Sequence, residues 1–295
     1  MTRQWAAVVV NYEAGDQLLG CMESLLADDS TGDAPAVVVV DNGSTDGSVE
    51  ALERAYPDVA VVRPGVNVGY AAGANRGIAA TEAPIVAVCN ADIVVDAGTG
   101  KAMLARFAAE PDLGAVGPGI ANPDGSVYPS ARTVPRTRDA VGHGLFGRLW
   151  PTNRFTRRYR QLDVDPERAR DADWVSGAAV WLRRAALDEI DGWDERYFMY
   201  VEDVDLCWRL RRAGWRVAYE PGARVTHLLG QSTALHPYRM IVEHHRSLAR
   251  FAARRWQGVK KVILVPAVAF LALRALLEMA THALRGRGRP ARMGR

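Results

Sequence analysis

The chain has 295 residues, of which 48% are hydrophobic and 24% are charged, with a formal net charge of +3. This composition excludes a disordered or collagen-like chain, and the length allows one large domain or two with a buried core. Three cysteines far apart in the sequence, Cys21, Cys89 and Cys207, predict neither a disulfide framework nor a zinc site.

Apolar runs alternate with segments of helical spacing over the first 120 residues. We expect strands at 6–10, 36–40, 59–62 and 85–89, and helices at 18–26, 47–56, 71–80 and 100–109. Continuous Val-rich strands are typical of a parallel sheet that is buried on both faces by helices. Ligands of such sheets bind beyond the carboxyl ends of the strands. Four polar clusters fall there, at 11–13, 41–44, 65–67 and 90–92.

Regular elements are sparser in the middle of the chain. Residues 122–126 carry a turn signal, and residues 132–172 are rich in Arg, Gly and Pro with little periodicity. The latter segment predicts a long loop, which could serve as a mobile lid. After it we expect a strand at 175–182 and helices at 185–190, 204–213 and 237–256.

The C-terminal segment is both basic and apolar. From Arg250 onward there are eleven Lys and Arg residues and one acid, whereas the first 249 residues carry 26 basic and 33 acidic side chains. The run 262–273 is uncharged but too short for a bilayer span, which needs about 20 residues. Apolar residues with basic flanks favour a helix in the membrane interface, facing an anionic surface. The alternative is a helix packed on the core or on a second subunit.

The amino-terminal residues Met1–Trp5 lead directly into the first expected strand. They leave no room for a signal peptide. We therefore expect a cytoplasmic protein that lies peripherally on the inner face of the plasma membrane.

Three acids lie within four positions of an aromatic-rich segment: Glu202, Asp203 and Asp205. Apolar flanks around clustered carboxylates predict a half-buried cleft, in which the pKa of a carboxylate can be shifted to suit a general base. The alternative is a set of first-turn acids stabilised by the helix dipole, a role that suits Asp205.

A metal site is predicted where Asn90-Ala91-Asp92 ends a buried strand. Mg²⁺ and Mn²⁺ favour oxygen ligands, and a bound diphosphate can complete a shell that one or two carboxylates begin. The alternative for Asp92 is a helix N-cap or a solvated turn. His227 follows a short strand downstream of the acids, which favours a metal ligand over a structural histidine.

The turn 41–47 follows another strand. Asp41 lies at the strand end, where its carboxylate could accept from a nucleobase imide or a ribose hydroxyl, while Asp46 suits a cap for the next helix. No glycine-rich dinucleotide motif follows the first strand, and the sequence contains neither a P-loop nor a Gly-x-Ser-x-Gly elbow.

Five motifs in order resemble family 2 glycosyltransferases, which have the GT-A fold and invert the anomeric centre. They span 8–12, 40–48, 67–77, 90–92 and 197–206, and the resemblance covers about residues 5 to 235. More narrowly, residues 123–132 and 195–203 are similar to those of the actinobacterial rhamnosyltransferases of cell-wall linker synthesis. The resemblance implies transfer of L-rhamnose from dTDP-rhamnose to a lipid-linked acceptor, polyprenyl-diphosphoryl-GlcNAc.

The fold that this resemblance implies is a Rossmann-like α/β domain over 1–235, with a mostly parallel central sheet flanked by helices. Its nucleotide-binding half would cover about 1–120 and its acceptor half 121–235, and a helical basic and apolar extension would follow at 236–295. The implied partners are the nucleotide sugar, the lipid-linked acceptor and the inner membrane surface, with a homo-oligomer possible and no nucleic acid.

Site roles also follow from the resemblance. Asp203 would be the general base, assisted by Glu202, and Asp92 and His227 would hold Mg²⁺ or Mn²⁺. Asn90 departs from the acidic first position of the family's Asp-x-Asp motif, and an amide supplies no charge to a metal. Residues expected to border the nucleotide are Val10, Tyr12, Glu13, Asp41, Asn42, Gly69, Asn75, Asn90, Ala91 and Asp92. Residues expected to border the acceptor are Tyr128, Arg132, Gly177 and Trp193.

Other classes of function remain open at this point. The donor could carry galactofuranose or another hexose. A nucleotidyltransferase would want a glycine-rich and basic triphosphate loop after the first strand, where residues 11–16 are acidic instead. A non-catalytic sugar-nucleotide-binding protein would tolerate loss of the base or of a metal ligand, and both are present.

Overall fold

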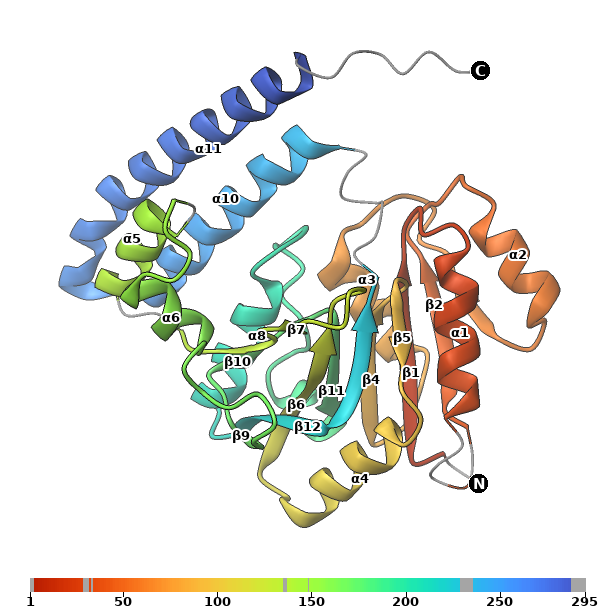
Figure 1. The fold of residues 1–295 in the computed structure, drawn as a ribbon. Coiled ribbons are helices and arrows are strands. Elements are labelled where there is room, and N and C mark those ends of the chain that lie inside the picture. Colours follow the sequence, from red (N-terminus) through yellow and green to blue (C-terminus); the bar gives the residue numbers. More distant parts are fainter. Residues whose placement is uncertain are drawn as a thin grey trace.

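A central sheet of Val-rich strands organises the molecule in the computed structural model, which describes residues 3–28, 32, 34–134, 137–147, 149–228 and 236–287 (Figure 1). Its strands lie in the order β3 (Ala60–Val62), β2 (Ala36–Asp41), β1 (Trp5–Asn11), β4 (Ile85–Asn90), β11 (Ala179–Arg183), β6 (Leu113–Ala121), β12 (Arg216–His227) and β5 (Ile93–Val95). Short strands β7 (Val127–Tyr128) and β9 (Arg170–Asp171) pair with β6 and β12. A separate antiparallel ribbon joins β8 (Ala131–Arg132) to β10 (Trp174–Val175).

Strand direction follows the expectation of a mostly parallel sheet. Strands β3, β2, β1 and β4 are mutually parallel, and β6 and β12 run the same way, whereas β11 and β5 run opposite to their neighbours. The predicted α/β architecture is thereby confirmed. The carboxyl ends of β1, β2 and β4 meet at one edge, because parallel strands share a direction.

Helices cover both faces of this sheet. Alternate residues of β1 enter different cores: Val9 packs with Leu18 and Met103, whereas Val8 packs with Ala74 and Leu206. This alternation follows from the two-residue period of a strand. The helices of the two layers are α1 (Gln17–Ala27), α2 (Ser48–Ala55), α3 (Tyr70–Ala79), α4 (Thr99–Ala109), α7 (Arg184–Glu189) and α8 (Glu202–Arg212).

The prediction of a long loop over 132–172 is wrong. This segment contains α5 (Thr137–Phe146) and α6 (Arg154–Arg160) as well as β9. Asn153 caps α6 by accepting hydrogen bonds from the backbone N–H groups of Phe155 and Thr156, and Thr156 Oγ1 lies 2.9 Å from His143 Nδ1 of α5. The two helices stabilise each other through such polar contacts, which apolar periodicity does not reveal.

The strand expected at 175–182 is in fact two strands. It breaks at residues 176–178, so that β10 pairs with β8 whereas β11 pairs with β4 and β6. At the break, Ser176 Oγ accepts a hydrogen bond from the Ala178 N–H. In this turn the N–H of the buried Gly177 donates to Asp203 of α8, where the functional site lies.

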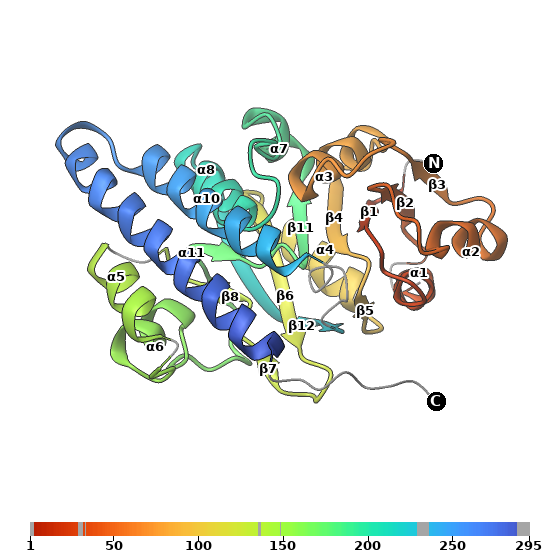
Figure 2. The same cartoon turned by 90° about the horizontal axis from the view of Figure 1, so that it is seen from above.

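Two helices and a 3₁₀ turn end the described chain: α10 (Pro237–Arg255), η1 (Gly258–Ile263) and α11 (Leu264–Arg287). Helices α10 and α11 lie side by side, and α5 and α6 flank them away from the sheet (Figures 1 and 2). The basic residues beyond 287 lie outside the described part of the chain.

The prediction that the C-terminal apolar segment is too short to span a bilayer is wrong. The stretch Lys261–Leu284 has 24 residues, which suffices by length and composition to span a bilayer, and most of these residues are exposed. The helix continues past Arg274 to Arg287. Arg274 Nε lies 3.1 Å from Glu278 Oε1, one turn later. The pair offsets the two charges, so the apolar surface of α11 continues beyond them.

Candidate active site

A cavity of about 1170 Å³ lies at the carboxyl ends of β1 and β4 and reaches between α5, α10 and α11. Four of the predicted site residues do not line it: Glu13, Asp41, Asn75 and Trp193. The others do, namely Val10, Tyr12, Asn42, Gly69, Asn90, Ala91, Asp92, Tyr128, Arg132, Gly177, Glu202, Asp203 and His227.

Glu13 and Asp41 shape the turn after β2. Glu13 Oε1 accepts hydrogen bonds from the N–H and the hydroxyl of Thr45, and Asp41 Oδ1 accepts from the Ser44 N–H at 3.0 Å. Asn11 at the end of β1 donates to Ser44 Oγ at 3.1 Å. These contacts hold the carboxyl ends of β1 and β2 together at the rim of the cavity.

Asp46 lies one residue before the N-cap of α2, which is Gly47 and not Asp46 as predicted. Its Oδ1 accepts from the Ser48 N–H at 3.1 Å, at the start of α2, and its Oδ2 accepts from the Gly15 N–H at 2.7 Å. Hydrogen bonds from Ser48 and Gly15 lower the pKa of Asp46 and outweigh the effect of burial, which raises it.

Asn42 forms the wall of the cavity next to β1. Its Nδ2 donates to the Gly69 carbonyl at 3.1 Å, and its buried Oδ1 has no protein partner within the described residues. A side chain at Gly73 would approach Asn42 Nδ2 to 3.2 Å, so a glycine there lets α3 pack closely behind the amide. An unsatisfied buried acceptor facing a cavity suits a ligand that donates a hydrogen bond.

Gly69 joins the nucleotide side of the cavity to the segment that precedes α8. Its φ is +88°, and a Cβ at this position would lie 2.5 Å from the Phe198 carbonyl oxygen. The next residue, Tyr70, donates from its N–H to that same oxygen at 2.8 Å, and its hydroxyl donates to the Gly177 carbonyl at 2.6 Å. Only glycine meets both the conformation and the close approach.

Asn75 and Trp193 lie behind this junction. Asn75 Nδ2 donates to the Trp193 carbonyl at 2.9 Å, and its Oδ1 accepts from the Trp193 N–H at 2.9 Å. The Trp193 ring packs edge-on against Tyr70 with centroids 5.7 Å apart. Trp193, held by Asn75, therefore supports Tyr70 from behind. Tyr70 lines the cavity, whereas Asn75 and Trp193 do not.

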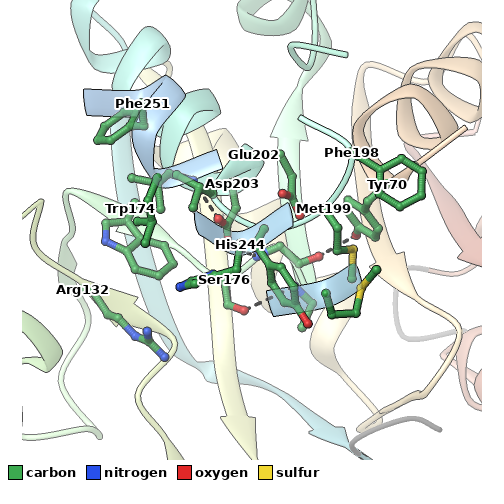
Figure 3. Close-up of a pocket in the computed structure, with 18 of the residues that line it drawn as sticks. Tyr70, Arg132, Trp174, Ser176, Phe198, Met199, Glu202, Asp203, His244 and Phe251 are labelled. Carbon is green, nitrogen blue, oxygen red and sulfur yellow. Dashed lines mark hydrogen bonds between the residues drawn. The ribbon is translucent and has the colours of Figure 1, made fainter. Parts of the chain in front are cut away.

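The two carboxylates Glu202 and Asp203 begin α8 and face the cavity. Asp203 Oδ2 accepts from the Gly177 N–H at 3.0 Å, and its Oδ1 accepts from the Val204 N–H at 2.8 Å. Figure 3 shows both acids at the centre of the site, with Trp174 to one side and Phe198 and Tyr70 to the other. The hydrogen bonds fix the orientation of Asp203.

Burial changes the protonation of both acids. It raises the pKa of Asp203, although the Gly177 and Val204 N–H groups and the charge of Arg132 act in the opposite direction. It also raises the pKa of Glu202 well above its usual range, and the neighbouring Asp203 adds to this rise. Glu202 Oε2 is buried without a protein partner among the described residues. One acid of the pair can hold a proton while the other accepts one.

The backbone before α8 is strained. Tyr200 and Val201 both have φ of +67°, although neither is glycine and Val201 is β-branched. Such conformations cost on the order of 1–3 kcal/mol each and persist where the surrounding structure demands them. Here they turn the chain so that the acids at 202 and 203 point inward as the helix begins.

Asp92 and His227 form a second polar cluster. Their Oδ1 and Nε2 atoms are 3.1 Å apart, and Asn90 Nδ2 lies 3.3 Å from the same imidazole nitrogen. The Asp92 carbonyl accepts from the Leu228 N–H at 2.8 Å, which joins the turn after β4 to the end of β12. The sequence separates these residues by more than a hundred positions, and the sheet brings them together.

One carboxylate and one imidazole can hold a divalent ion only if other ligands complete its shell. No group of three or more His, Cys, Asp or Glu side chains suited to a metal gathers within the described ranges. Mg²⁺ and Mn²⁺ bind in this way in many sites, where one or two protein ligands act together with phosphate oxygens. The donor set therefore fits an ion that arrives with a diphosphate.

Arg132 is held rigidly on the opposite wall. Its guanidinium lies 5.2 Å from the Tyr128 ring centre, 5.7 Å from that of Tyr159 and 5.0 Å from that of Trp174. It also donates to the Pro129 carbonyl and to the Tyr128 hydroxyl. A cation fixed in this way suits an anionic ligand.

Several lining residues were not predicted from the sequence. Tyr70 and Ser176 adjoin Gly69 and Gly177, and their neighbours could have indicated them. Others come from α5, α6, α10 and α11, where no chemical motif distinguishes them. They include His143, Tyr159, Arg239, His244, Phe251 and Phe270.

The family model described as "Glycosyltransferase like family 2" matches residues 3–247. An N-acetylglucosaminyl-diphospho-decaprenol L-rhamnosyltransferase of Mycobacterium tuberculosis is 39% identical over 269 residues, which are 88% of this chain and 87% of the relative.

Two solved structures share the fold. A mannosyltransferase from Pyrobaculum calidifontis in complex with GDP-Man and Mn²⁺ aligns with a TM-score of 0.58 at 18% identity, over 98% of this chain and 82% of that one. The structure of GalNAc-T7 with UDP, GalNAc and Mn²⁺ aligns with a TM-score of 0.62 at 13% identity, over 88% of this chain and 49% of that one. At these identities the likeness concerns the fold.

Proposed function

The chain belongs to the family 2 glycosyltransferases, and on that premise we propose that it moves L-rhamnose from dTDP-rhamnose to a polyprenyl-diphosphate-linked GlcNAc acceptor in cell-wall synthesis. The similarity to the mycobacterial rhamnosyltransferase, which extends over most of both chains, is the observation that carries the choice of sugar and acceptor. The cavity supports it by presenting a buried carboxylate pair and a cation to the same space.

The proposed reaction is a single displacement with inversion. Asp203 takes the proton of an acceptor hydroxyl, the hydroxyl oxygen bonds to the anomeric carbon, and the bond from that carbon to dTDP breaks. Hydrogen bonds from Gly177 and Val204 hold the base still during attack. Because burial raises the pKa of Asp203, the carboxylate is a stronger base than an exposed aspartate.

Glu202 has a supporting role in this proposal. Its unpartnered Oε2 and its raised pKa suit a protonated carboxyl that donates a hydrogen bond to the acceptor or to the base. A neutral neighbour also leaves Asp203 free to carry the negative charge that catalysis requires.

The donor diphosphate would lie beside Asp92 and His227. These two residues would hold Mg²⁺ or Mn²⁺, which would supply positive charge to the departing dTDP. Asn90 stands in place of an acid, and its Nδ2 lies 3.3 Å from His227 Nε2. Asn42 and Gly69 border the same side of the cavity and would contact the nucleotide.

The acceptor diphosphate would meet the opposite wall. Arg132, which three aromatic rings hold in place, has the charge and rigidity for that task, and the Tyr128 hydroxyl accepts a hydrogen bond from it. A lipid-linked acceptor also requires the protein to work at a membrane. We propose that α11, mostly exposed and apolar, holds it on the cytoplasmic leaflet.

A transfer assay tests the proposal. The purified protein is given polyprenyl-diphosphoryl-GlcNAc with dTDP-rhamnose, UDP-galactofuranose or UDP-glucose, with and without Mg²⁺ or Mn²⁺. Metal-dependent product from dTDP-rhamnose alone, with inverted configuration by NMR, supports the proposal. Product from another donor would mean that the transferred sugar is not rhamnose. If no donor gives product, the assignment of acceptor and reaction is overturned.

A further inference from the structure

The cavity is larger than one donor molecule requires. Its volume of about 1170 Å³ exceeds the roughly 300–1,000 Å³ usual for a pocket that holds one small ligand. The additional space extends away from Asp92 toward the C-terminal helices, and we call that part the apolar chamber. It is defined by Val141 of α5, Leu248 and Phe251 of α10, and Ala267, Phe270 and Leu271 of α11.

The apolar chamber is firmly joined to the catalytic segment. Ser247 of α10 donates to the carbonyl of Met199 at 3.1 Å, and Met199 directly precedes the strained residues that lead into α8. Phe251 packs edge-on against Trp208 of α8 with centroids 6.1 Å apart. His244 does the same with Tyr200 at 5.3 Å. Whatever fills the chamber is therefore held at a set position relative to Asp203.

Charge within the cavity is divided unequally. Among the described lining residues the acids are Asp92, Glu202 and Asp203, all assigned above to the reacting centre, whereas five arginines line the same cavity. The Arg239 guanidinium stacks 4.3 Å from the Phe198 ring centre. The arginines of the lining are Arg132, Arg160, Arg239, Arg255 and Arg274. A ligand that combines an anionic head with an apolar tail complements this lining.

Helix α11 gives such a ligand a route to the cavity. One face of the helix forms a wall of the chamber, through Ala267 and Phe270, while its other side is open: Val265 is 77% exposed and Leu276 is 60% exposed. An apolar surface of this kind is stable against lipid and unfavourable in water. The chamber thus lies directly behind the surface that would face the membrane.

We propose that the apolar chamber between α5, α10 and α11 binds the first isoprene units of the lipid acceptor, next to its diphosphate. This inference rests on the proposed function. It adds that the enzyme recognises the lipid chain itself, so the chain contributes to affinity at a site within the protein and does not only anchor the acceptor in the membrane.

The test compares two acceptors with the same GlcNAc-diphosphate head, a short one carrying a methyl group in place of the lipid and one carrying a long polyprenyl chain. Both are assayed in the same neutral detergent, so that partition into an anionic surface does not contribute. Ala267→Trp fills the chamber. Ala269→Trp is the matched control, since Ala269 lies on the same helix, is exposed and does not line the cavity.

We expect the wild type to have a lower KM for the long acceptor than for the short one. Ala267→Trp should raise the long-chain KM about tenfold, since losing the burial of even two methylenes changes affinity by about that factor. The KM and kcat for the short acceptor should stay within about twofold, because its head remains in place. Ala269→Trp should change neither.

Two further outcomes decide between failures. If the wild type transfers no sugar to either acceptor, the proposed function fails. If the wild type is active but Ala267→Trp affects both acceptors equally, or neither, the inference about the chamber is overturned. Photolabelling gives a readout without turnover. An acceptor with a photoreactive group in its first isoprene unit should label peptides from α10 or α11. Label confined to peptides around Arg132 would contradict the inference about the chamber.

Discussion

Arg254 Nη1 lies 3.0 Å from Asp205 Oδ1, so a side chain of the C-terminal helix α10 pairs with an acid inside the catalytic segment. The same nitrogen lies 2.6 Å from Asp194 Oδ2. Asp205 is completely buried, accepts from Arg209 at 2.7 Å and is the third acid of the sequence cluster. Its part is structural: it fixes α8 to α10, while its neighbours face the cavity.

Replacing Arg254 should destabilise the protein. Arg254→Ala leaves a buried carboxylate with one partner fewer, and we expect a loss of about 2–3 kcal/mol in the free energy of unfolding, measured by urea denaturation. Arg246→Ala on the same helix is the control. Its pair with Glu243 is exposed, so the loss should be under about 0.5 kcal/mol. Equal losses for the two variants would contradict the anchoring role.

The base assignment predicts a selective loss of turnover. Asp203→Asn keeps the shape of the side chain but not its basicity, so kcat should fall by a factor on the order of 10²–10⁴. The dissociation constant of the nucleotide sugar, measured by calorimetry, should stay within about twofold, because Asp203 does not bind the nucleotide sugar in this mechanism. Asp58→Asn, at an exposed position, is the control. Turnover retained in Asp203→Asn would remove Asp203 from the mechanism.

The pH dependence of kcat/KM should report the raised pKa of the base. Burial raises the pKa of Asp203, so activity should be lost, as pH falls, at a higher pH than for an ordinary aspartate. The positive charge of Arg132 opposes this rise. Arg132→Met should therefore move the acidic limb to higher pH, besides weakening acceptor binding. A limb that moves to lower pH in this variant would show that another group titrates there.

Metal binding should depend on Asp92. In the Asp92→Ala variant, Mn²⁺ should no longer strengthen the binding of dTDP, because one of the two protein ligands is lost. Calorimetry with and without Mn²⁺ measures this effect without turnover, and the EPR signal of free Mn²⁺ provides a second readout. Asp96→Ala, an exposed acid on the loop after β5, should behave like the wild type. Unchanged Mn²⁺ coupling in Asp92→Ala would place the ion elsewhere.

Stability should fall in mild acid because two histidines, His143 and His244, are half-buried in neutral form. Burial, assisted by nearby positive charge, lowers the pKa of His143 to about 4 and that of His244 to about 4. The unfolded chain protonates first as pH falls, since an exposed histidine titrates near 6.5. The stabilisation is therefore fully present above about pH 6.5 and is lost down to about pH 4.

Urea unfolding at pH 7.5 and at pH 5.0 measures that loss. A double variant, His143→Asn with His244→Gln, should show a smaller difference between the two pH values than the wild type. His282→Gln is the control, since this histidine is exposed on α11. If the double variant and the wild type lose the same stability, the acid sensitivity arises from other groups.

Local sequence signals predicted helices and strands correctly where the spacing of apolar residues alone determines the element. The Val-rich runs at β1, β2 and β4 form a buried sheet, and helix α1 lies within one residue of its expected range. They failed where polar contacts replaced apolar periodicity, as at the Asn153 cap and the His143–Thr156 contact that stabilise α5 and α6. The length of the apolar segment in α11 was underestimated because the uncharged run was taken to end before Arg274. The charge of Arg274 is offset by Glu278.

The sequence by itself determined the fold class and the edge of the sheet at which polar residues gather, because both depend on short-range spacing and on the shared direction of parallel strands. Only the tertiary structure decided which of those residues face the cavity: Asp92 meets His227 there, whereas Asn75 holds Trp193 behind the wall. It also decided that α10 and α11 complete the cavity. Such contacts join residues far apart in the chain, and their geometry is set only when the whole core packs.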